Sequence, residues 1–182
     1  VVDDNSSDGT WDLAEKFASN FENIICFRRI TSKGLSSAVI DGFMISKGMF
    51  VAVIDADLQH DEEILLKMLD CLRTGIDLAV GSRYCEDGSA GDWKTSRKFV
   101  SKVATKIGRS IGNVNLSDPM SGFFMIKKDI FLDVADKING KGYKILLDIV
   151  TQFNEEKKIT IQDVPYTFKS RLYGESKLTP EV

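Results

Sequence analysis

Three oxygen-bearing side chains follow a short apolar segment in the first third of the chain. Residues 50–54 read FVAVI, and the sequence then becomes polar at Asp55, Asp57 and Gln59. Five apolar residues bounded by polar ones predict a buried strand, and alternate residues of an extended chain share one face. We therefore expect these three side chains to point the same way, just past the strand. Carboxylate and amide oxygens suit Mg²⁺ or Mn²⁺, which often take further ligands from substrate phosphates, so the pattern predicts metal-dependent chemistry on a diphosphate.

His60, the single histidine of the chain, adjoins this segment. We interpret it as a neighbour of the site and not as a ligand. Two aspartates separated by one residue are also common in solvated turns. The attached Gln59, the strand before it and a helix start predicted at Asp61 favour a metal site here.

The first ten residues place another acidic pair at the end of a strand. The segment VDDNSSDGT at 2–10 is typical of a strand end followed by a tight turn, in which Asp8 or Thr10 caps the next helix. That interpretation leaves Asp3 and Asp4 unexplained, because adjacent like charges repel unless a ligand or a cation lies between them. We expect one of the two to bind a ligand.

Basic residues supply candidate anion sites. Arg83 closes the predicted strand that ends in GSRY at 81–84, on the same sheet edge as the aspartates, and we expect it to bind an anion. Arg97 and Ser101 lie one helical turn apart in a basic segment (94–112) that holds six Lys or Arg residues and no acid. A guanidinium and a hydroxyl on one helix face can hold one phosphate. The same helix face also fits solvent or an anionic membrane surface.

Two loop segments carry further polar candidates. Asp118, in the segment SDPMSGFF at 117–124, can bind sugar hydroxyls, act as a base or organise the turn. Arg171 and Lys177 lie in a polar, glycine-containing segment at 168–178. Such a segment can close over a phosphorylated ligand, or it can form a loose tail.

Apolar strands and amphipathic helices alternate along the chain. We expect strands at 1–2, 24–28, 50–54, 78–82, 122–127 and 159–166. We expect helices at 10–20, 36–47, 61–72, 94–111, 129–138 and 143–156. This alternation predicts an α/β domain with a mainly parallel sheet covered by helices on both faces, and ligands bind such sheets at the carboxyl ends of the strands.

The composition is that of an ordinary globular protein. The 182 residues suffice for one domain spanning 1–182, and the net charge of −3 names no partner, so we expect no nucleic acid. Three widely spaced cysteines (Cys26, Cys71 and Cys85) predict reduced thiols. The chain opens on Val and not on Met, so we expect a fragment that lacks a first βα unit.

Taken together, the motifs resemble those of the family 2 glycosyltransferases of the GT-A fold, and within them the dolichyl-phosphate or polyprenyl-phosphate mannosyltransferases. The matching segments keep the order found in that family and cover nearly the whole chain. They are VDDNSSDGT at 2–10, KGLSSAVIDGF at 33–43, DADLQH at 55–60, GSRY at 81–84, SDPMSGFF at 117–124, GYKILLDI at 142–149 and FKSRLYGESKL at 168–178.

The resemblance implies a role for each candidate. The residues expected to bind the donor are Asp3, Asp4, Lys33, Asp55, Arg171 and Lys177. The divalent metal, Mg²⁺ or Mn²⁺, would be held by Asp55, Asp57 and Gln59. The phosphate of the lipid acceptor would be held by Arg83, Arg97 and Ser101. The residues expected to act in catalysis are Asp57, Arg83 and Asp118.

The resemblance also implies the reaction. A GT-A domain of this type would move a hexose to dolichyl or polyprenyl phosphate with inversion, and we expect mannose from GDP-mannose here. We expect such a protein to be cytoplasmic and peripheral on the cytoplasmic face of a membrane. The first strand of the family, with a PxYNE-like segment, is absent here, and residues 61–63 read DEE where the family has Pro-Pro-Glu.

Three alternatives stay open. The same fold and metal site can serve UDP-glucose in a polyprenyl-phosphate glucosyltransferase. A nucleotidyltransferase that makes sugar nucleotides would carry a basic, Gly-rich loop near its start, and none is visible in this sequence. A non-catalytic homologue that only binds sugar nucleotides would bind the donor without turnover.

Overall fold

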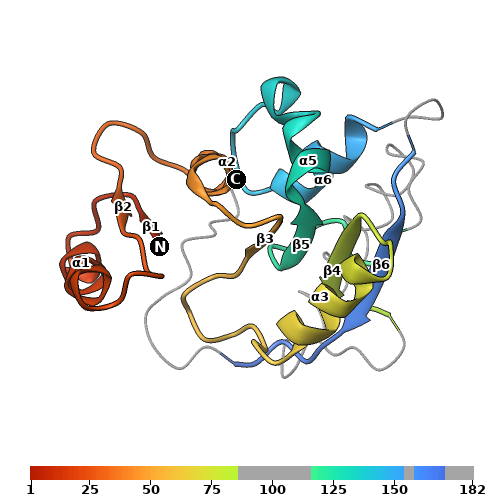
Figure 1. Cartoon of the computed structure of the whole chain (residues 1–182), viewed down its shortest axis with the longest axis horizontal. Helices are drawn as coiled ribbons and strands as arrows, with labels where there is room; N and C mark the ends of the chain where they lie inside the picture. The colour runs from red at the N-terminus through yellow and green to blue at the C-terminus, as the bar shows by residue number, and fades with distance from the viewer. Residues whose placement is uncertain (86–115, 154–157, 171–182) are drawn as a thin grey trace. The chain divides into compact units, whose positions relative to one another are not determined.

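The computed structural model describes residues 1–85, 116–153 and 158–170 (Figure 1). The chain divides into two compact units, and each is described by itself. The first is Val1–Lys47 with Asn139–Ile145, and the second is Gly48–Ile138 with Leu146–Val182. The expectation of one domain over 1–182 stays a prediction.

The first unit holds a small parallel sheet and two helices. These elements are β1 (Val2–Asp3), α1 (Thr10–Asn20), β2 (Phe27–Arg28) and α2 (Leu35–Ile45). The predicted helix at 10–20 is confirmed, and α2 begins one residue before the predicted 36–47. Helix α2 lies close to β1 because Gly42 has no side chain, and a Cβ there would lie 3.0 Å from Val2 Cγ2.

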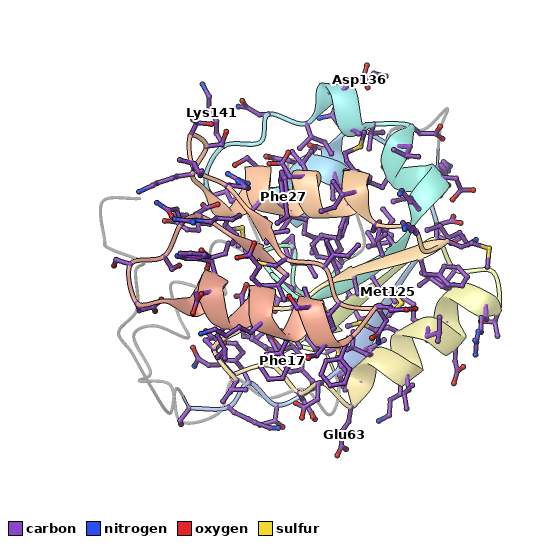
Figure 2. The ribbon with its side chains drawn as sticks, turned by 60° about the vertical axis from the view of Figure 1, so that its left-hand side comes forward. Phe17, Phe27, Glu63, Met125, Asp136 and Lys141 are labelled. Atoms are coloured by element: carbon purple, nitrogen blue, oxygen red, sulfur yellow. The ribbon has the colours of Figure 1, made fainter. Side chains whose placement is uncertain are left out.

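Helix α1 keeps its apolar side chains at the surface. None of its residues is buried, and Phe17 and Phe21 stack with their ring centroids 6.2 Å apart. Phe17 on α1 and Phe27 on β2 are labelled in Figure 2 and are 49% and 37% exposed. The amphipathic pattern therefore predicted the helix, but its apolar side is not a buried core face.

The second unit is built on a four-stranded sheet. Its strands are β3 (Phe50–Val53), β4 (Leu78–Ser82), β5 (Phe124–Lys127) and β6 (Ile161–Pro165). The order across the sheet is β3-β5-β4-β6. Strand β5 runs antiparallel to both neighbours and β6 runs parallel to β4, so three of the four strands share one direction. This places the ends of β3 and β4 that carry the candidate residues on one edge of the sheet (Figure 1).

The helices of the second unit follow the apolar pattern, with shifted boundaries. They are α3 (Ile64–Arg73), α5 (Lys128–Leu132), the short 3₁₀-helix η1 (Ala135–Lys137) and α6 (Ile145–Thr151). The start predicted at Asp61 is wrong. The amides of Ile64 and Leu65 bond three residues back, to the carbonyls of Asp61 and Glu62. Residues 61–63 therefore form a separate tight turn before the α-helix.

Helix α3 covers one face of the sheet. Ile64, Met68 and Leu72, spaced four residues apart, are buried in one cluster with Ala79 of β4 and Met125 of β5. Burying three such side chains contributes about 1.5–3 kcal/mol each. The alternate sheet residues that point the other way are also fully buried, among them Val80, Phe124 and Ile126. Both faces of the sheet are therefore covered.

A polar network closes the end of the sheet away from the candidate residues. Asp77 accepts from Lys127 Nζ at 2.8 Å and from the Thr160 amide and hydroxyl, each at 2.9 Å. Burial alone would raise the pKa of Asp77, but these donors outweigh burial and lower it.

We expect Asp77→Asn to reduce the free energy of unfolding by about 2 kcal/mol at pH 7. Because the folded-state pKa is the lower one, the contribution is present above the unfolded value of 3.8 and is lost as pH falls through the folded value. Urea unfolding at pH 7 and pH 3 should show a smaller difference between wild type and variant at the lower pH. Asp70→Asn, on the exposed surface of α3, is the matched control. Equal effects of the two variants at pH 7 would contradict the role of this network.

Among the described residues, no helix has both the length and the apolar character needed to cross a bilayer.

Candidate active site

The turn after β3 brings the predicted metal ligands together by a different geometry from the one expected. The strand ends at Val53 and residues 56–58 turn, with Leu58 at φ 60°, so an extended course through 59 is wrong. Asp57 instead closes a tight turn by accepting the Gln59 amide on Oδ1 at 3.1 Å. Asp55 and Asp57 are half-buried. The two carboxylates and Gln59 therefore belong to one short turn at the sheet edge.

Gln59 is oriented by the segment that follows β6. Its Nε2 donates to the Lys169 carbonyl at 2.9 Å, and the Lys169 amide donates to the Gln59 carbonyl, also at 2.9 Å. Only the NH₂ end of the amide can donate to a carbonyl, so this bond assigns the two ends of the side chain. The amide oxygen is then the atom that can take a cation, and the turn is tied to a distant part of the chain.

His60 lies in a cluster of aromatic rings behind this turn. We call His60, Phe123, Tyr166 and Phe168 the aromatic cluster. The centroid of the imidazole lies 4.9, 5.8 and 5.4 Å from those of the other three rings, in that order. Burial lowers the pKa of His60 to about 4, so the ring is neutral at pH 7. Its Nδ1 accepts the backbone amide of Asp55 at 3.3 Å.

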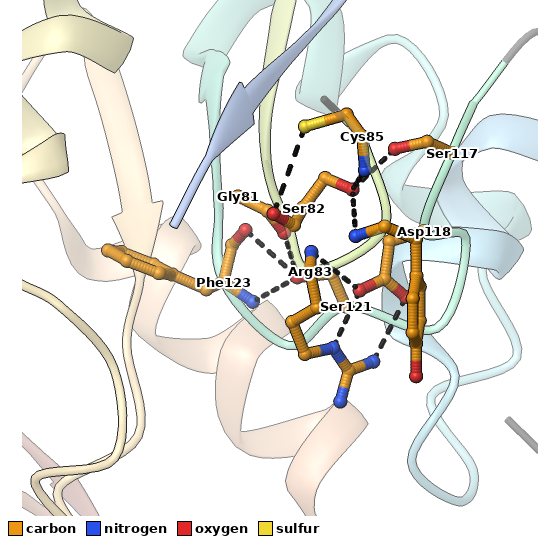
Figure 3. A network of polar contacts seen from close by, with 9 residues as sticks. Gly81, Ser82, Arg83, Cys85, Ser117, Asp118, Ser121 and Phe123 are labelled. Carbon is orange, nitrogen blue, oxygen red and sulfur yellow. Dashed lines mark hydrogen bonds and ion pairs between the residues drawn. The ribbon is translucent and has the colours of Figure 1, made fainter. Parts of the chain in front are cut away.

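Arg83 and Asp118 form a bidentate ion pair at the end of β4 (Figure 3). Arg83 Nε lies 2.7 Å from Asp118 Oδ2, and Nη2 lies 3.0 Å from Oδ1. The Asp118 side chain is fully buried and that of Arg83 is 11% exposed. Burial alone would lower the pKa of Arg83, but the pair with Asp118 outweighs it and raises that pKa. The pairing favours a role for Asp118 in organising the turn over roles in binding sugar hydroxyls or acting as a base.

Hydroxyl groups hold the loop that carries Asp118 against β4 (Figure 3). Ser121 Oγ donates to the Gly81 carbonyl at 2.7 Å, and the hydroxyls of Ser82 and Ser117 bond to each other. Gly81 is required by space, since a Cβ there would lie 3.1 Å from both a ring carbon and the carbonyl oxygen of Phe123. These contacts fix the position of Arg83 and Asp118.

The ring of Phe168 lies near both His60, at the end of the turn, and the Arg83–Asp118 ion pair. Phe168 contacts His60, and the Arg83 guanidinium lies 5.6 Å from the Phe168 centroid. Burial raises the pKa of Tyr166, so its hydroxyl is neutral at pH 7. Two half-buried carboxylates and a half-buried guanidinium are therefore held near one another by aromatic packing. This arrangement suits two anionic groups and a divalent cation.

In the other compact unit, Asp4 is neutralised from within the chain. Arg29 is buried, with Nε 3.0 Å from Asp4 Oδ1 and Nη1 3.4 Å from Asp41 Oδ2. Asp4 Oδ2 also accepts the Gly34 amide at 2.7 Å. Asp3 is buried and accepts the Ser6 amide at 2.8 Å. Arg29 therefore supplies a counter-charge to Asp4, and no motif in the sequence indicated this pairing.

We expect Arg29→Met to destabilise this unit by about 2 kcal/mol, because Asp4 and Asp41 lose their shared cation. Hydrogen exchange measured by mass spectrometry should show faster exchange in β1 and α2. Lys16→Met, which removes an exposed ion pair with Asp12, is the control and should change exchange little. Unchanged protection in the Arg29 variant would contradict this role.

The remaining predicted site residues divide into two groups. Lys33 is described and lies exposed in the first unit, before α2. The other four lie outside the described residues, namely Arg97, Ser101, Arg171 and Lys177. Sequence reasoning singled out neither Lys169, which lies within the motif at 168–178, nor Tyr166, which lies two residues before it.

Comparisons with known proteins agree with these motifs. Residues 1–134 match the model of the family described as glycosyl transferase family 2. The chain belongs to this family. The resemblance to the family 2 glycosyltransferases is thereby confirmed.

Curated relatives extend over nearly the whole chain. A dolichol-phosphate mannosyltransferase of Pyrococcus furiosus is 41% identical over 180 residues, which are 98% of this chain and 49% of the relative. One from Saccharomyces cerevisiae is 36% identical over 100% of this chain and 68% of the relative. An undecaprenyl-phosphate mannosyltransferase of Micrococcus luteus is 36% identical over 98% and 74%. The chain thus spans about half the length of the archaeal relative.

Solved structures show the same fold at low identity. The glucosyl-3-phosphoglycerate synthase of Mycobacterium tuberculosis, in complex with Mn²⁺, UDP and glucosyl-3-phosphoglycerate, gives a TM-score of 0.68 at 16% identity. The match covers 96% of this chain and 61% of that one. A complex of the same enzyme with Mg²⁺ and UDP gives 0.66 at 16% identity, over 96% and 60%.

Proposed function

We propose that this chain is the catalytic part of a polyprenyl-phosphate mannosyltransferase. It would transfer mannose from GDP-mannose to a dolichyl or polyprenyl monophosphate, with inversion at the anomeric carbon. The observation that carries this proposal is the turn after β3, which holds two carboxylates and an oriented amide near the Arg83–Asp118 ion pair. The names of the relatives support mannose and a prenyl phosphate as the substrates.

A divalent cation fits the turn. Asp55 and Asp57 offer hard oxygen ligands, and the bond from Gln59 to Lys169 leaves the amide oxygen as the donor that can face the ion. Within the described ranges, no three or more His, Cys, Asp or Glu residues form a set that could hold a metal. The protein would then supply part of a coordination shell, as suits an ion that also binds phosphates. Solved relatives of this fold hold Mn²⁺ or Mg²⁺ beside UDP.

The proposed reaction needs no strong base, because the acceptor phosphate is already ionised. A phosphate monoester is mostly ionised at pH 7, since its second pKa is about 6. The acceptor oxygen is therefore already a nucleophile, and Arg83 would hold it against the repulsion of the donor diphosphate. Asp118 would keep the Arg83 fork in one orientation. When bound, the cation would stabilise negative charge on the leaving diphosphate.

The donor and acceptor assignments of the other residues stay proposals. Asp3 and Asp4, with the nearby Lys33, would bind the nucleoside side of the donor, and internal pairing with Arg29 makes Asp4 the weaker candidate of the two acids. Acceptor phosphate would also contact Arg97 and Ser101. The donor side would be closed by Arg171 and Lys177. A prenyl acceptor requires a membrane surface, so we propose that the protein works as a peripheral protein on the cytoplasmic face.

A donor panel tests the proposal. The protein, in its full-length form, is given a short-chain prenyl phosphate and, in parallel, labelled GDP-mannose, UDP-glucose and UDP-N-acetylglucosamine. We expect label in the lipid product only with GDP-mannose and only with Mg²⁺ or Mn²⁺. Transfer from UDP-glucose alone would support a glucosyltransferase, a candidate favoured by the UDP complexes of the solved relatives. Donor binding without turnover would indicate a non-catalytic homologue.

A further inference from the structure

The backbone at Asp55 is held by a side chain that the reaction does not otherwise use. His60 Nδ1 accepts the Asp55 amide at 3.3 Å. A neutral imidazole that accepts on Nδ1 carries its proton on Nε2. The bond spans five residues, so it joins the two ends of the turn that contains Asp55, Asp57 and Gln59. The position of the first carboxylate in this turn therefore depends on where the imidazole lies.

The imidazole has little freedom to move. His60 is 5% exposed, and its ring contacts those of Phe123, Tyr166 and Phe168. The first of these residues directly precedes β5, and the other two follow β6. The rings of Phe123 and Tyr166 also pack edge to face, with their centroids 5.6 Å apart. Because this packing holds the imidazole in place, the hydrogen bond to Nδ1 also holds the Asp55 backbone in place.

The turn requires such support because its backbone is strained. Leu58 adopts φ 60°, a left-handed conformation that costs a β-carbon-bearing residue about 1–2 kcal/mol. Its side chain is 62% exposed, so packing of Leu58 does not offset this cost. Three hydrogen bonds hold the strained turn closed, namely those donated by the Asp55 amide to His60, by the Gln59 amide to Asp57 and by the Gln59 side chain to the Lys169 carbonyl.

We propose that His60 is a positioning residue, which fixes the Asp55 backbone so that the two carboxylates of the turn are held ready for a divalent cation. This inference rests on the proposed function, because it concerns the same turn. His60 itself binds neither the cation nor substrate. Residues that orient metal ligands in this way change metal affinity about 10–100-fold when they are replaced.

Two substitutions separate the hydrogen bond from the packing. His60→Asn keeps an acceptor at the place of Nδ1 and removes the ring. His60→Phe keeps a ring in the aromatic cluster and removes the acceptor. Mn²⁺ binding is measured for each by electron paramagnetic resonance, with MnCl₂ alone and with GDP, and Tm is measured on the same samples.

We expect the two variants to rank in opposite order in the two measurements. His60→Phe should bind Mn²⁺ about tenfold more weakly than wild type, and the Asp55 amide should exchange its hydrogen faster. His60→Asn should have the lower Tm but an Mn²⁺ affinity close to that of wild type. If His60→Phe does not fold, His60→Asn decides the matter by itself. The proposal would be overturned if the folded Asn variant bound Mn²⁺ tenfold more weakly than wild type.

Other outcomes overturn either this inference or the proposed function. Mn²⁺ affinity that follows Tm in both variants, or that is unchanged in His60→Phe, would show that His60 only packs, while the proposed function would stand. Wild-type protein without Mn²⁺ binding would overturn the proposed metal site, and this inference with it.

Discussion

Replacing Asp57 by alanine should abolish sugar transfer while leaving the fold intact. We expect a loss of at least about a thousandfold in kcat/KM, because several kcal/mol of transition-state stabilisation depend on the cation in this turn. Mn²⁺ binding should be lost as well. The free energy of unfolding should fall by about 1 kcal/mol, the usual cost of losing a hydrogen bond such as the one that Asp57 Oδ1 accepts from the Gln59 amide.

The Asp57→Asn variant separates charge from turn geometry. Its side-chain oxygen can still accept the Gln59 amide, so the turn should keep its stability while Mn²⁺ affinity and transfer fall nearly as far as in Asp57→Ala. Asp70→Asn on the exposed side of α3 controls for the general loss of one negative charge. Normal turnover by either Asp57 variant with Mg²⁺ would refute the role of Asp57 in metal binding.

The second large effect is expected at Asp118. Asp118→Asn should lower the free energy of unfolding by about 3 kcal/mol, because it leaves the charge of Arg83 buried without its counter-charge. An amide can accept only on its oxygen, so its NH₂ group would face one N–H of the guanidinium. With Arg83 no longer fixed, KM for the prenyl phosphate should rise more than KM for GDP-mannose. Urea unfolding and steady-state kinetics measure the two effects.

A double variant tests whether the pair acts as a unit. Arg83→Met with Asp118→Leu replaces both charges by apolar side chains, and such replacements are often neutral for stability. We expect this variant to unfold near the wild-type urea concentration and to have lost transfer. If Asp118→Asn proved as stable as wild type and kept its KM for the acceptor, the ion pair would have neither role.

The sequence was most predictive where a short run of residues determines its own secondary structure. The apolar residues before Asp55 predicted β3, and the pattern over 61–72 predicted a helix, although α3 begins only at Ile64. The candidate ligands were found because all three lie within five residues. Their shared face was inferred from an extended chain, and this failed because Leu58 takes a left-handed conformation that residue propensity does not favour.

Contacts between distant segments could not be read from the sequence. The pairs Arg29–Asp4, Gln59–Lys169 and Arg83–Asp118 are each set by the fold, and no local pattern matches the partners. The aromatic cluster around His60 is of the same kind, because its rings come from three separate segments. The antiparallel direction of β5 was likewise not predicted, since apolar content alone gives a strand no direction.

Anomalous diffraction from crystals of the protein grown with MnCl₂ and GDP tests the central claim most directly. The account predicts a manganese peak within coordination distance of the carboxylates of Asp55 and Asp57 and of the Gln59 side-chain oxygen, with GDP phosphate oxygens completing the shell. A manganese peak on GDP at another place, with none at this turn, would contradict it.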